Sequence, residues 1–378
     1  MSFKTFCKPF ILILFLLCLN AFTAKAQKGK EGFGMEMNAM GGRLFKHTSR
    51  FTGPIPSFSY GTDLNFLWKT NGKASWQQRR CYPTVGVGIT YTHYDKEVYG
   101  QSVGIYPNLE LPVIRRQNLE WTFRFGMGLG YISKHYSPFA PNWDTLNNAM
   151  GAHINNFSLL SSDLRYHINK HWDLQAGISF THMSSAKFRL PNLGVNYLGG
   201  HIGLRYFPNT SQPNKIVRKL QPLRNRYLLQ LRQGIAMSTG ESRGSAATPV
   251  YLSSLYVSKR YWGKNKVFAG IDYSYHQSVY DFQRIQGINL GEEKKYAWKS
   301  GVFLGHEFLY GRVGLHLQIG GYIHQALLGN APIYQKLGMN WYIIQKETGL
   351  VKELCVSTLL KTHYATAELA ELGIGIGL

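Results

Sequence analysis

The feature that most constrains the fold is an alternation of large apolar residues with polar or very small ones. Between positions 119 and 131 every odd position is apolar, whereas the even positions carry Glu, Thr, Arg or Gly. The same period of two appears in 85–91, 313–319 and 374–378. Side chains of a β-strand point alternately to the two faces of a sheet, so this pattern predicts strands with one apolar face and one polar or bare face.

Soluble β-sandwiches also alternate, but further features favour a transmembrane antiparallel β-barrel. The strand-like segments run for about 10–14 residues, longer than the five or six that soluble strands average, and aromatic residues cluster near their ends. Connections alternate in length: short ones lie near 115–118, 168–172, 262–265 and 309–312, and long ones near 135–153, 185–195, 240–248 and 277–294. Short turns on one side and long loops on the other are typical of outer-membrane barrels.

The chain contains about sixteen such segments in two sets of eight, which predicts an all-β protein built from two eight-stranded repeats. The end of the first set, FTHMSSAKFRLPNLGVNYLGGHIGL, resembles the end of the second, KTHYATAELAELGIGIGL, as after a duplication. One large barrel and two small ones both remain open. Pairing of 35–46 with 196–207 would mean two barrels, and pairing with 372–378 would mean one; the glycines of the inner face suit a narrow, packed lumen.

The N-terminus predicts export. Lys4 and Lys8 precede an apolar run from Phe10 to Leu19, and Ala24-Lys25-Ala26 forms a small-x-small cleavage site, as in a secretory signal peptide. Ten apolar residues are too few to cross about 30 Å of hydrocarbon. We therefore expect a signal peptide at 1–26, a first repeat at 27–208, a linker or ordered periplasmic loop at 209–225 and a second repeat at 226–378.

The charge balance is basic, with 42 Lys and Arg against 20 Asp and Glu. Because the basic residues are dispersed and the chain is exported, we expect an anionic membrane surface as partner and no nucleic acid. The 13 His residues lack the spacing of metal ligands, so neither a metal nor another cofactor is expected. After the signal peptide only Cys81 and Cys355 remain, too few for a disulfide framework, and we expect two isolated buried thiols.

The most informative segment is the predicted seventh strand, from Trp172 onward. Its even positions are apolar as far as Phe180, and continuing the phase puts His182 and Ser184 on the same lipid-facing side. On the next strand, Asn196 continues the lipid-facing positions toward the same end of the barrel. These polar side chains should therefore meet on the outer wall, near the membrane surface.

Two interpretations of this cluster compete. Polar side chains are ordinary at a membrane interface, and a His-x-Ser pair is common by chance. Residues two apart on a strand are about 7 Å apart at Cα, however, so an imidazole can reach the next hydroxyl on its face. That arrangement suits nucleophilic catalysis, with Ser184 as nucleophile, His182 as general base and a neighbouring group orienting the ring.

The run His182-Met183-Ser184-Ser185-Ala186, followed by Pro191-Asn192-Leu193-Gly194-Val195-Asn196, resembles the signature of the outer-membrane lipid A deacylases, the PagL-like acyloxyacyl hydrolases. The resemblance implies an eight-stranded barrel in the cell outer membrane that hydrolyses an ester-linked acyl chain of lipid A, the lipid anchor of lipopolysaccharide. It also implies roles for Ser184 as nucleophile, His182 as base and Asn192 in the oxyanion hole. Lys187 and Arg189 in the adjoining loop are candidates to bind lipid A phosphates.

Two positions depart from the family pattern. The acidic third member falls at Asn196, and the residue after the nucleophile, typically Asn, is Ser185. No Asp or Glu occurs between 174 and 240. An Asn can hold an imidazole tautomer but cannot offset imidazolium charge. Reduced activity, no activity and an acid supplied by another loop all stay open.

The second repeat offers His363 but has Ala365 at the nucleophile position, and the alternation turns His363 toward the lumen. We expect this repeat to be a catalytically silent scaffold. The leading hypothesis is thus a lipid A esterase acting in the outer leaflet. The alternative is a non-catalytic barrel, either a narrow porin or a surface-binding protein.

Overall fold

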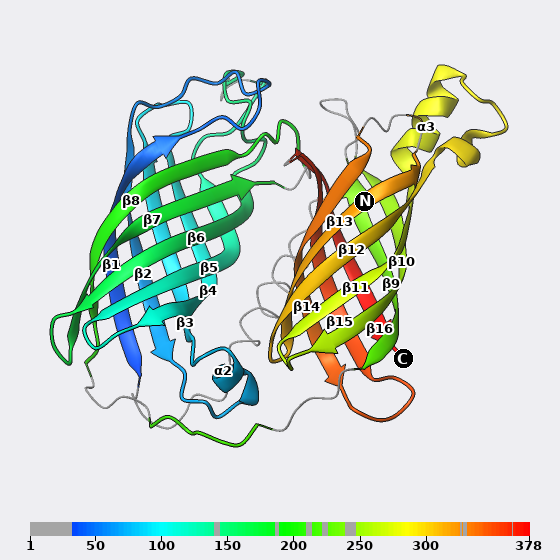
Figure 1. The fold of residues 1–378 in the computed structure, drawn as a ribbon. Coiled ribbons are helices and arrows are strands. Elements are labelled where there is room, and N and C mark those ends of the chain that lie inside the picture. The colour runs from blue at the N-terminus through cyan, green and yellow to red at the C-terminus, as the bar shows by residue number, and fades with distance from the viewer. Residues whose placement is uncertain are drawn as a thin grey trace, which may run out of the picture. The chain divides into compact units, whose positions relative to one another are not determined.

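The computed structural model describes residues 32–139, 144–185, 189–208, 214–220, 226–238, 247–325, 327, 331–364 and 366–378. The predicted signal peptide, Lys187 and Ala365 lie outside these residues. The protein forms two closed antiparallel β-barrels of eight strands each (Figure 1). The all-β prediction of two eight-stranded repeats is confirmed.

The strands of the first barrel are β1 (Phe33–Leu44), β2 (Ser59–Lys69), β3 (Thr84–Tyr94), β4 (Gln101–Arg115), β5 (Leu119–Ile132), β6 (Ile154–His167), β7 (Trp172–Ser184) and β8 (Val195–Tyr206). The barrel closes where β1 pairs with β8, in a register that runs from Met35 opposite Tyr206 to Leu44 opposite Tyr197. This pairing is the one that distinguishes two small barrels from one large one.

The strands of the second barrel are β9 (Tyr227–Ser238), β10 (Thr248–Tyr261), β11 (Asn265–His276), β12 (Trp298–Tyr310), β13 (Val313–His324), β14 (Ile333–Gln345), β15 (Glu353–His363) and β16 (Thr366–Gly377). It closes through pairing of β16 with β9, where Gly373 lies opposite Gly234. The long β11–β12 connection carries α3 (Gln277–Gln286) and the short helix η2 (Glu293–Tyr296). None of the helices in the described ranges is long and apolar enough to cross a membrane.

In the first barrel, tight turns join β4 to β5 and β6 to β7, and long loops leave the opposite end. The β2–β3 connection is an exception at the tight-turn end, because it contains the short helix α2 (Ser75–Arg79). Part of the segment between the repeats packs against this connection. The backbone N–H of Ile216 donates to the Asn71 carbonyl at 2.8 Å, and that of Arg218 donates to the Gln78 side chain at 3.1 Å. Residues 214–218 are thus docked on the first barrel.

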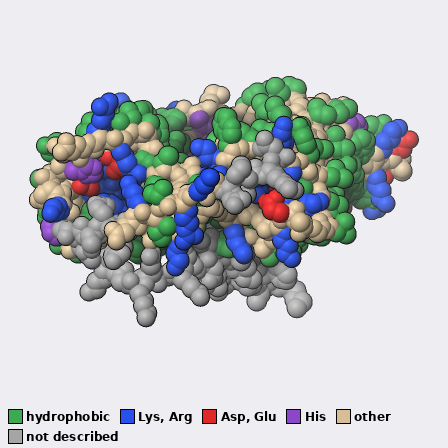
Figure 2. All heavy atoms as spheres, turned by 60° about the horizontal axis from the view of Figure 1, so that its bottom comes forward, with side chains coloured by type: hydrophobic (Ala, Val, Ile, Leu, Met, Phe, Trp, Pro, Cys, Tyr) green, Lys and Arg blue, Asp and Glu red, His purple; other side chains and the backbone are tan. Residues whose placement is uncertain are grey.

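The two faces of β7 follow the predicted alternation. Ile178 is 61 % exposed on the outside, whereas Gln175 and Ser179 on the inside are almost fully buried. Hydrophobic side chains likewise cover much of the outer walls visible in Figure 2. Aromatic pairs lie on these walls near both strand ends, such as Trp172 with Tyr206 at the tight-turn end. The outer wall therefore has the apolar band and aromatic belts of a membrane barrel.

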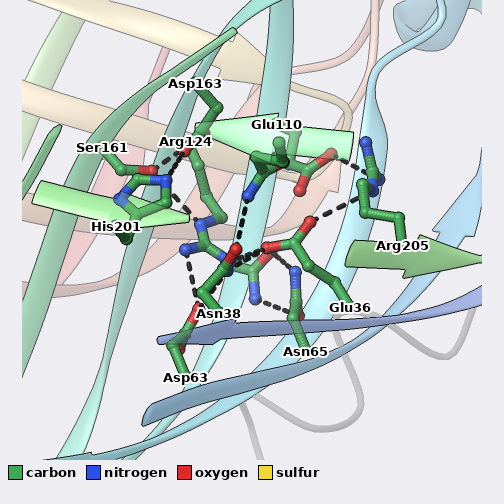
Figure 3. Close-up of polar contacts among 12 residues, drawn as sticks. Glu36, Asn38, Asp63, Asn65, Glu110, Arg124, Ser161, Asp163, His201 and Arg205 are labelled. Atoms are coloured by element: carbon green, nitrogen blue, oxygen red, sulfur yellow. Dashed lines mark hydrogen bonds and ion pairs between the residues drawn. The ribbon is translucent and has the colours of Figure 1, made fainter. Parts of the chain in front are cut away.

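Ion pairs fill the lumen of the first barrel. The Arg124 guanidinium bridges Glu36 at 2.9 Å and Asp63 at 2.8 Å, and Arg205 contacts Glu36 and Glu110 at 3.1 Å each (Figure 3). These side chains are at most 2 % exposed. The lumen is packed, as expected. Buried charged side chains, rather than the glycines of the inner face, fill most of it. Mutual pairing is what makes such burial tolerable.

An apolar core closes the long-loop end of the first barrel. It joins Leu44, Phe51 and Met150 to Met183 and Val195 at the tops of β7 and β8. This core fixes the loops against the strand ends that carry the predicted site. The cysteine prediction is wrong in part: Cys355 is buried, but Cys81 is exposed, since it follows α2 in the β2–β3 connection rather than pointing into a barrel.

Candidate active site

A chain of hydrogen bonds lies on the outer wall of the first barrel, at the long-loop end of β7 and β8. The Ser184 Oγ is 3.0 Å from the His182 Nε2, and the His182 Nδ1 is 2.7 Å from the Asn196 Oδ1. An amide oxygen only accepts, so Nδ1 carries the proton and Nε2 is the nitrogen that accepts from the serine hydroxyl. This is the tautomer that a general base for Ser184 requires.

The pairing of β7 with β8 brings these side chains together. His182 lies directly opposite Asn196 in the β7–β8 pair, and Ser184 is two residues further along the same face of β7. Between them Met183, opposite Val195, points inward to the apolar core. The polar side chains therefore stand on a strand end whose opposite face is packed.

The cluster lies directly above the apolar wall. His182 is half-buried, whereas Ser184 is 4 % exposed and Asn196 is 6 % exposed. Two positions below on the same face come Phe180 and Leu198, which are cross-strand partners of each other. His182 is thus the most exposed member of the cluster, on the lipid-facing side of the barrel.

Gly194 approaches the imidazole closely. It has φ +74°, a backbone conformation that favours glycine, and a Cβ there would lie 2.8 Å from the His182 Cε1. Its N–H donates to the Ala149 carbonyl at 2.9 Å, which ties the β7–β8 loop to the β5–β6 loop. Only glycine fits both the conformation and the contact at this position.

His47 extends the hydrogen-bond chain, and it was not predicted from the sequence. The Asn196 Nδ2 lies 2.8 Å from the His47 Nδ1, and the backbone N–H of Phe45 donates to the Asn196 carbonyl at 3.1 Å. His47 comes from the β1–β2 loop and is 149 positions away in sequence. Only the closure of β1 onto β8 brings it here, so no local sequence signal could have found it.

The other predicted site residues lie in the β7–β8 connection. Asn192 is partly buried two positions before Gly194, Arg189 is exposed, and Lys187 lies outside the described residues. A neighbour not predicted from sequence is Asn156 of β6, the direct cross-strand partner of Ser184. Within the described ranges, no group of His, Cys, Asp and Glu side chains is arranged to hold a metal ion.

A second serine–histidine set lies inside the same barrel. The Ser179 Oγ is 2.8 Å from the His201 Nδ1, and the His201 Nε2 is 2.9 Å from the Asp163 Oδ1. By residue type this set is more complete than the outer one, since it includes a carboxylate. Ser179 is only 1 % exposed and Asp163 fully buried, however, among the ion pairs of the lumen. This hydroxyl is therefore enclosed by the polar side chains of the lumen.

The second barrel turns its corresponding histidine inward. The His363 Nε2 is 2.9 Å from the Tyr322 hydroxyl and 3.7 Å from the Glu368 Oε2, and Glu368 also binds Lys299 at 2.6 Å. His363 therefore belongs to a charged cluster in the lumen and not to the outer wall. This position agrees with the predicted phase of the strand.

Comparisons with known proteins agree with the architecture. A family model described as "Lipid A 3-O-deacylase (PagL)" matches residues 57–205, and one described as "Acyloxyacyl hydrolase, C-terminal domain" matches residues 225–378. No curated protein sequence matches the chain.

Similar solved structures are remote in sequence. Neisserial surface protein A is 12 % identical over 48 % of this chain and 99 % of its own, with a TM-score of 0.35. The outer membrane enzyme PagL is 15 % identical over 45 % of this chain and 97 % of its own, with a TM-score of 0.32.

Proposed function

Because the chain belongs to the lipid A 3-O-deacylase (PagL) family of outer-membrane β-barrels, we propose that its first barrel removes an ester-linked acyl chain from lipid A at the outer wall. The observation that carries the proposal is the hydrogen-bond chain from Ser184 through His182 to Asn196. Its nucleophile and base are within hydrogen-bond reach, and a third group orients the base. The second barrel contributes a scaffold.

The reaction begins with the Ser184 hydroxyl. Its oxygen attacks the carbonyl carbon of the ester while the proton moves to the His182 Nε2. The tetrahedral intermediate collapses as the sugar oxygen leaves and takes that proton from His182. The result is a free sugar hydroxyl and an acyl ester on Ser184. Water, deprotonated by the same nitrogen, then releases the fatty acid and restores the serine.

The position of the dyad suits a substrate that stays in the membrane. The ester bonds of a lipid lie close to the level of its headgroup, and the cluster lies just above the apolar wall formed by Phe180 and Leu198. A lipid can therefore diffuse laterally to the barrel and present its ester without leaving the bilayer. Arg189, and Lys187 two positions earlier in the sequence, are the cations that we assign to the phosphates of lipid A.

Asn196 stands where the family has an acid, and it defines what the site can do. Its oxygen holds the His182 tautomer, but a neutral amide does not offset the charge of the imidazolium that forms during attack. We therefore expect a working but slow esterase. Asn192 and Asn156, the partner of Ser184 across β6, are the amides that we assign to the oxyanion.

The test measures fatty acid released from lipid A by the purified full-length protein. Wild type should release it, and Ser184→Ala should not. Ser179→Ala is the matched control, because Ser179 lies on the same strand and also bonds a histidine, but faces the lumen. Equal release by wild type and Ser184→Ala would refute the proposed nucleophile.

A pore is the other function that a barrel suggests, and the observed lumen gives it no support. Arg124, Glu36 and Asp63 meet inside the first barrel in a network that is 1 % exposed or less. Ion conductance through the first barrel, measured in a planar bilayer, should therefore be negligible.

A further inference from the structure

The hydrogen-bond chain on the outer wall does not end at Asn196. The Asn196 Nδ2 reaches the His47 Nδ1 at 2.8 Å, while the Oδ1 of the same amide faces His182. We infer that His47 is a positioning residue, which holds the Asn196 amide with its oxygen toward His182 and so keeps the base in its active tautomer. The inference rests on the proposed function, because it assigns a role within the same site.

The need for such a residue follows from the chemistry of an amide. A carboxylate presents an acceptor to His182 in either orientation, but an Asn side chain presents an acceptor on one side and a donor on the other. With the NH₂ group toward His182, Nδ1 would have to accept and Nε2 would carry the proton. That nitrogen could not then take the proton of Ser184. Replacement of an acid by Asn196 thus creates an orientation that must be selected.

His47 makes the selection because its Nδ1 accepts. The Asn196 amide donates to it through Nδ2, which requires an unprotonated Nδ1 on His47. Burial lowers the pKa of His47 below its ordinary value, which favours this neutral form at pH 7. The titratable group that faces it from the barrel wall is His182 of β7, which contacts the other end of the same Asn196 amide. Lys46 and Arg50 flank it on its own loop and are exposed.

The loop around His47 is fixed on both sides. Before it, the Phe45 N–H donates to the Asn196 carbonyl at 3.1 Å. After it, the Arg50 carbonyl accepts from the Asn148 side chain at 2.7 Å, and Phe51 is 1 % exposed within the apolar core. A side chain between two anchored points loses little freedom when it makes one more hydrogen bond. His47 can therefore impose an orientation on the amide.

Protonation of His47 should reverse that orientation. With a proton on Nδ1, the ring becomes a donor and attracts the Asn196 oxygen. The amide then turns its NH₂ group toward His182, and the base is lost. His47 thus makes activity at low pH depend on its own charge as well as on that of His182.

The test is a double-mutant cycle between His47→Leu and Asn196→Asp, measured as the rate at which a fluorophosphonate labels Ser184 in the full-length protein. His47→Leu removes the acceptor and should slow labelling about five- to tenfold, the equivalent of one neutral hydrogen bond. In the Asn196→Asp background the same change should matter less than about twofold, because a carboxylate has no wrong orientation. His47→Gln offers a donor as well as an acceptor, so it does not select the orientation by itself and should label at a rate between those of wild type and His47→Leu.

The controls separate positioning from folding and from substrate choice. Each variant is first checked for the heat-modifiable electrophoretic mobility of a folded barrel, with Lys46→Leu as the matched loop substitution. The inference would be overturned if His47→Leu slowed labelling equally in both backgrounds or in neither. It would also be overturned if Ser184 were not labelled in wild type. The variants could show the predicted labelling rates while the same preparations release no fatty acid from lipid A. That result would leave the role of His47 intact and refute the proposed substrate.

Discussion

Two serine–histidine sets share the strand β7, five positions apart and on opposite faces. The inner set, Ser179 with His201 and Asp163, has the carboxylate that the outer set lacks. The outer set, Ser184 with His182 and Asn196, stands on the lipid-facing wall. The difference teaches that a serine, a histidine and a carboxylate in contact do not by themselves indicate an active site inside a barrel. Polar groups there must pair with one another simply because they are buried.

The inner polar groups stabilise the barrel, and we propose that the outer ones catalyse the reaction. Substitutions on the two faces should therefore separate cleanly, with inner changes reducing stability and outer changes reducing rate.

The largest effect should come from Ser184→Ala, which removes the nucleophile. We expect fatty acid release to fall at least about a thousandfold, with the barrel still folded. His182→Ala should cost about as much, and the double variant no more than either single one, because the two residues act as a unit. Additive losses would contradict a shared mechanism.

The next effect concerns stability and belongs to the inner face. Arg124→Met removes the guanidinium that pairs with Asp63 and one of those that pair with Glu36, and it should lower the free energy of unfolding by about 3–5 kcal/mol. Arg115→Met is the matched control, since its pair with Glu120 is partly exposed and should be worth less than about 1 kcal/mol. Both are measured by denaturant titration in lipid or detergent. Similar costs for the two would remove the distinction between buried and exposed pairs.

A smaller effect should follow from Asn196→Asp, which supplies the missing charge to the outer set. We expect the rate of release at neutral pH to rise about tenfold, because the carboxylate stabilises the imidazolium that forms during attack. Steady-state kinetics with lipid A in mixed micelles would measure this. A slower variant would show that Asn196 is adapted to its site rather than a defect.

The pH dependence should be the smallest effect and the most diagnostic. Burial lowers the pKa of His47, so the residue is neutral at pH 7 and gains its proton only as the pH falls below the ordinary imidazole value of about 6.5. In wild type, protonation of either His47 or His182 should remove the base, so below the lower of the two pKa values the acid limb should be steeper than for one proton. In His47→Gln it should follow one proton. Identical acid limbs in wild type and His47→Gln would argue against coupling between His47 and His182.

Much of this architecture could be predicted from the sequence. The period of two predicted the strands and their faces, and its phase placed His182, Ser184 and Asn196 together, because each depends only on local alternation along β7 and β8. His47 could not be predicted, since its position depends on the closure of β1 onto β8. The lumen network was missed for a similar reason: alternation shows that Arg124 points inward but not which carboxylates it meets.

The most direct measurement is mass spectrometry of lipid A from cells that carry wild type, Ser184→Ala or Ser179→Ala. We predict that wild type and Ser179→Ala yield lipid A that lacks one ester-linked acyl chain, whereas Ser184→Ala leaves that chain in place. Loss of deacylation in Ser179→Ala with normal folding, or continued deacylation in Ser184→Ala, would contradict the assignment of the reaction to the outer wall.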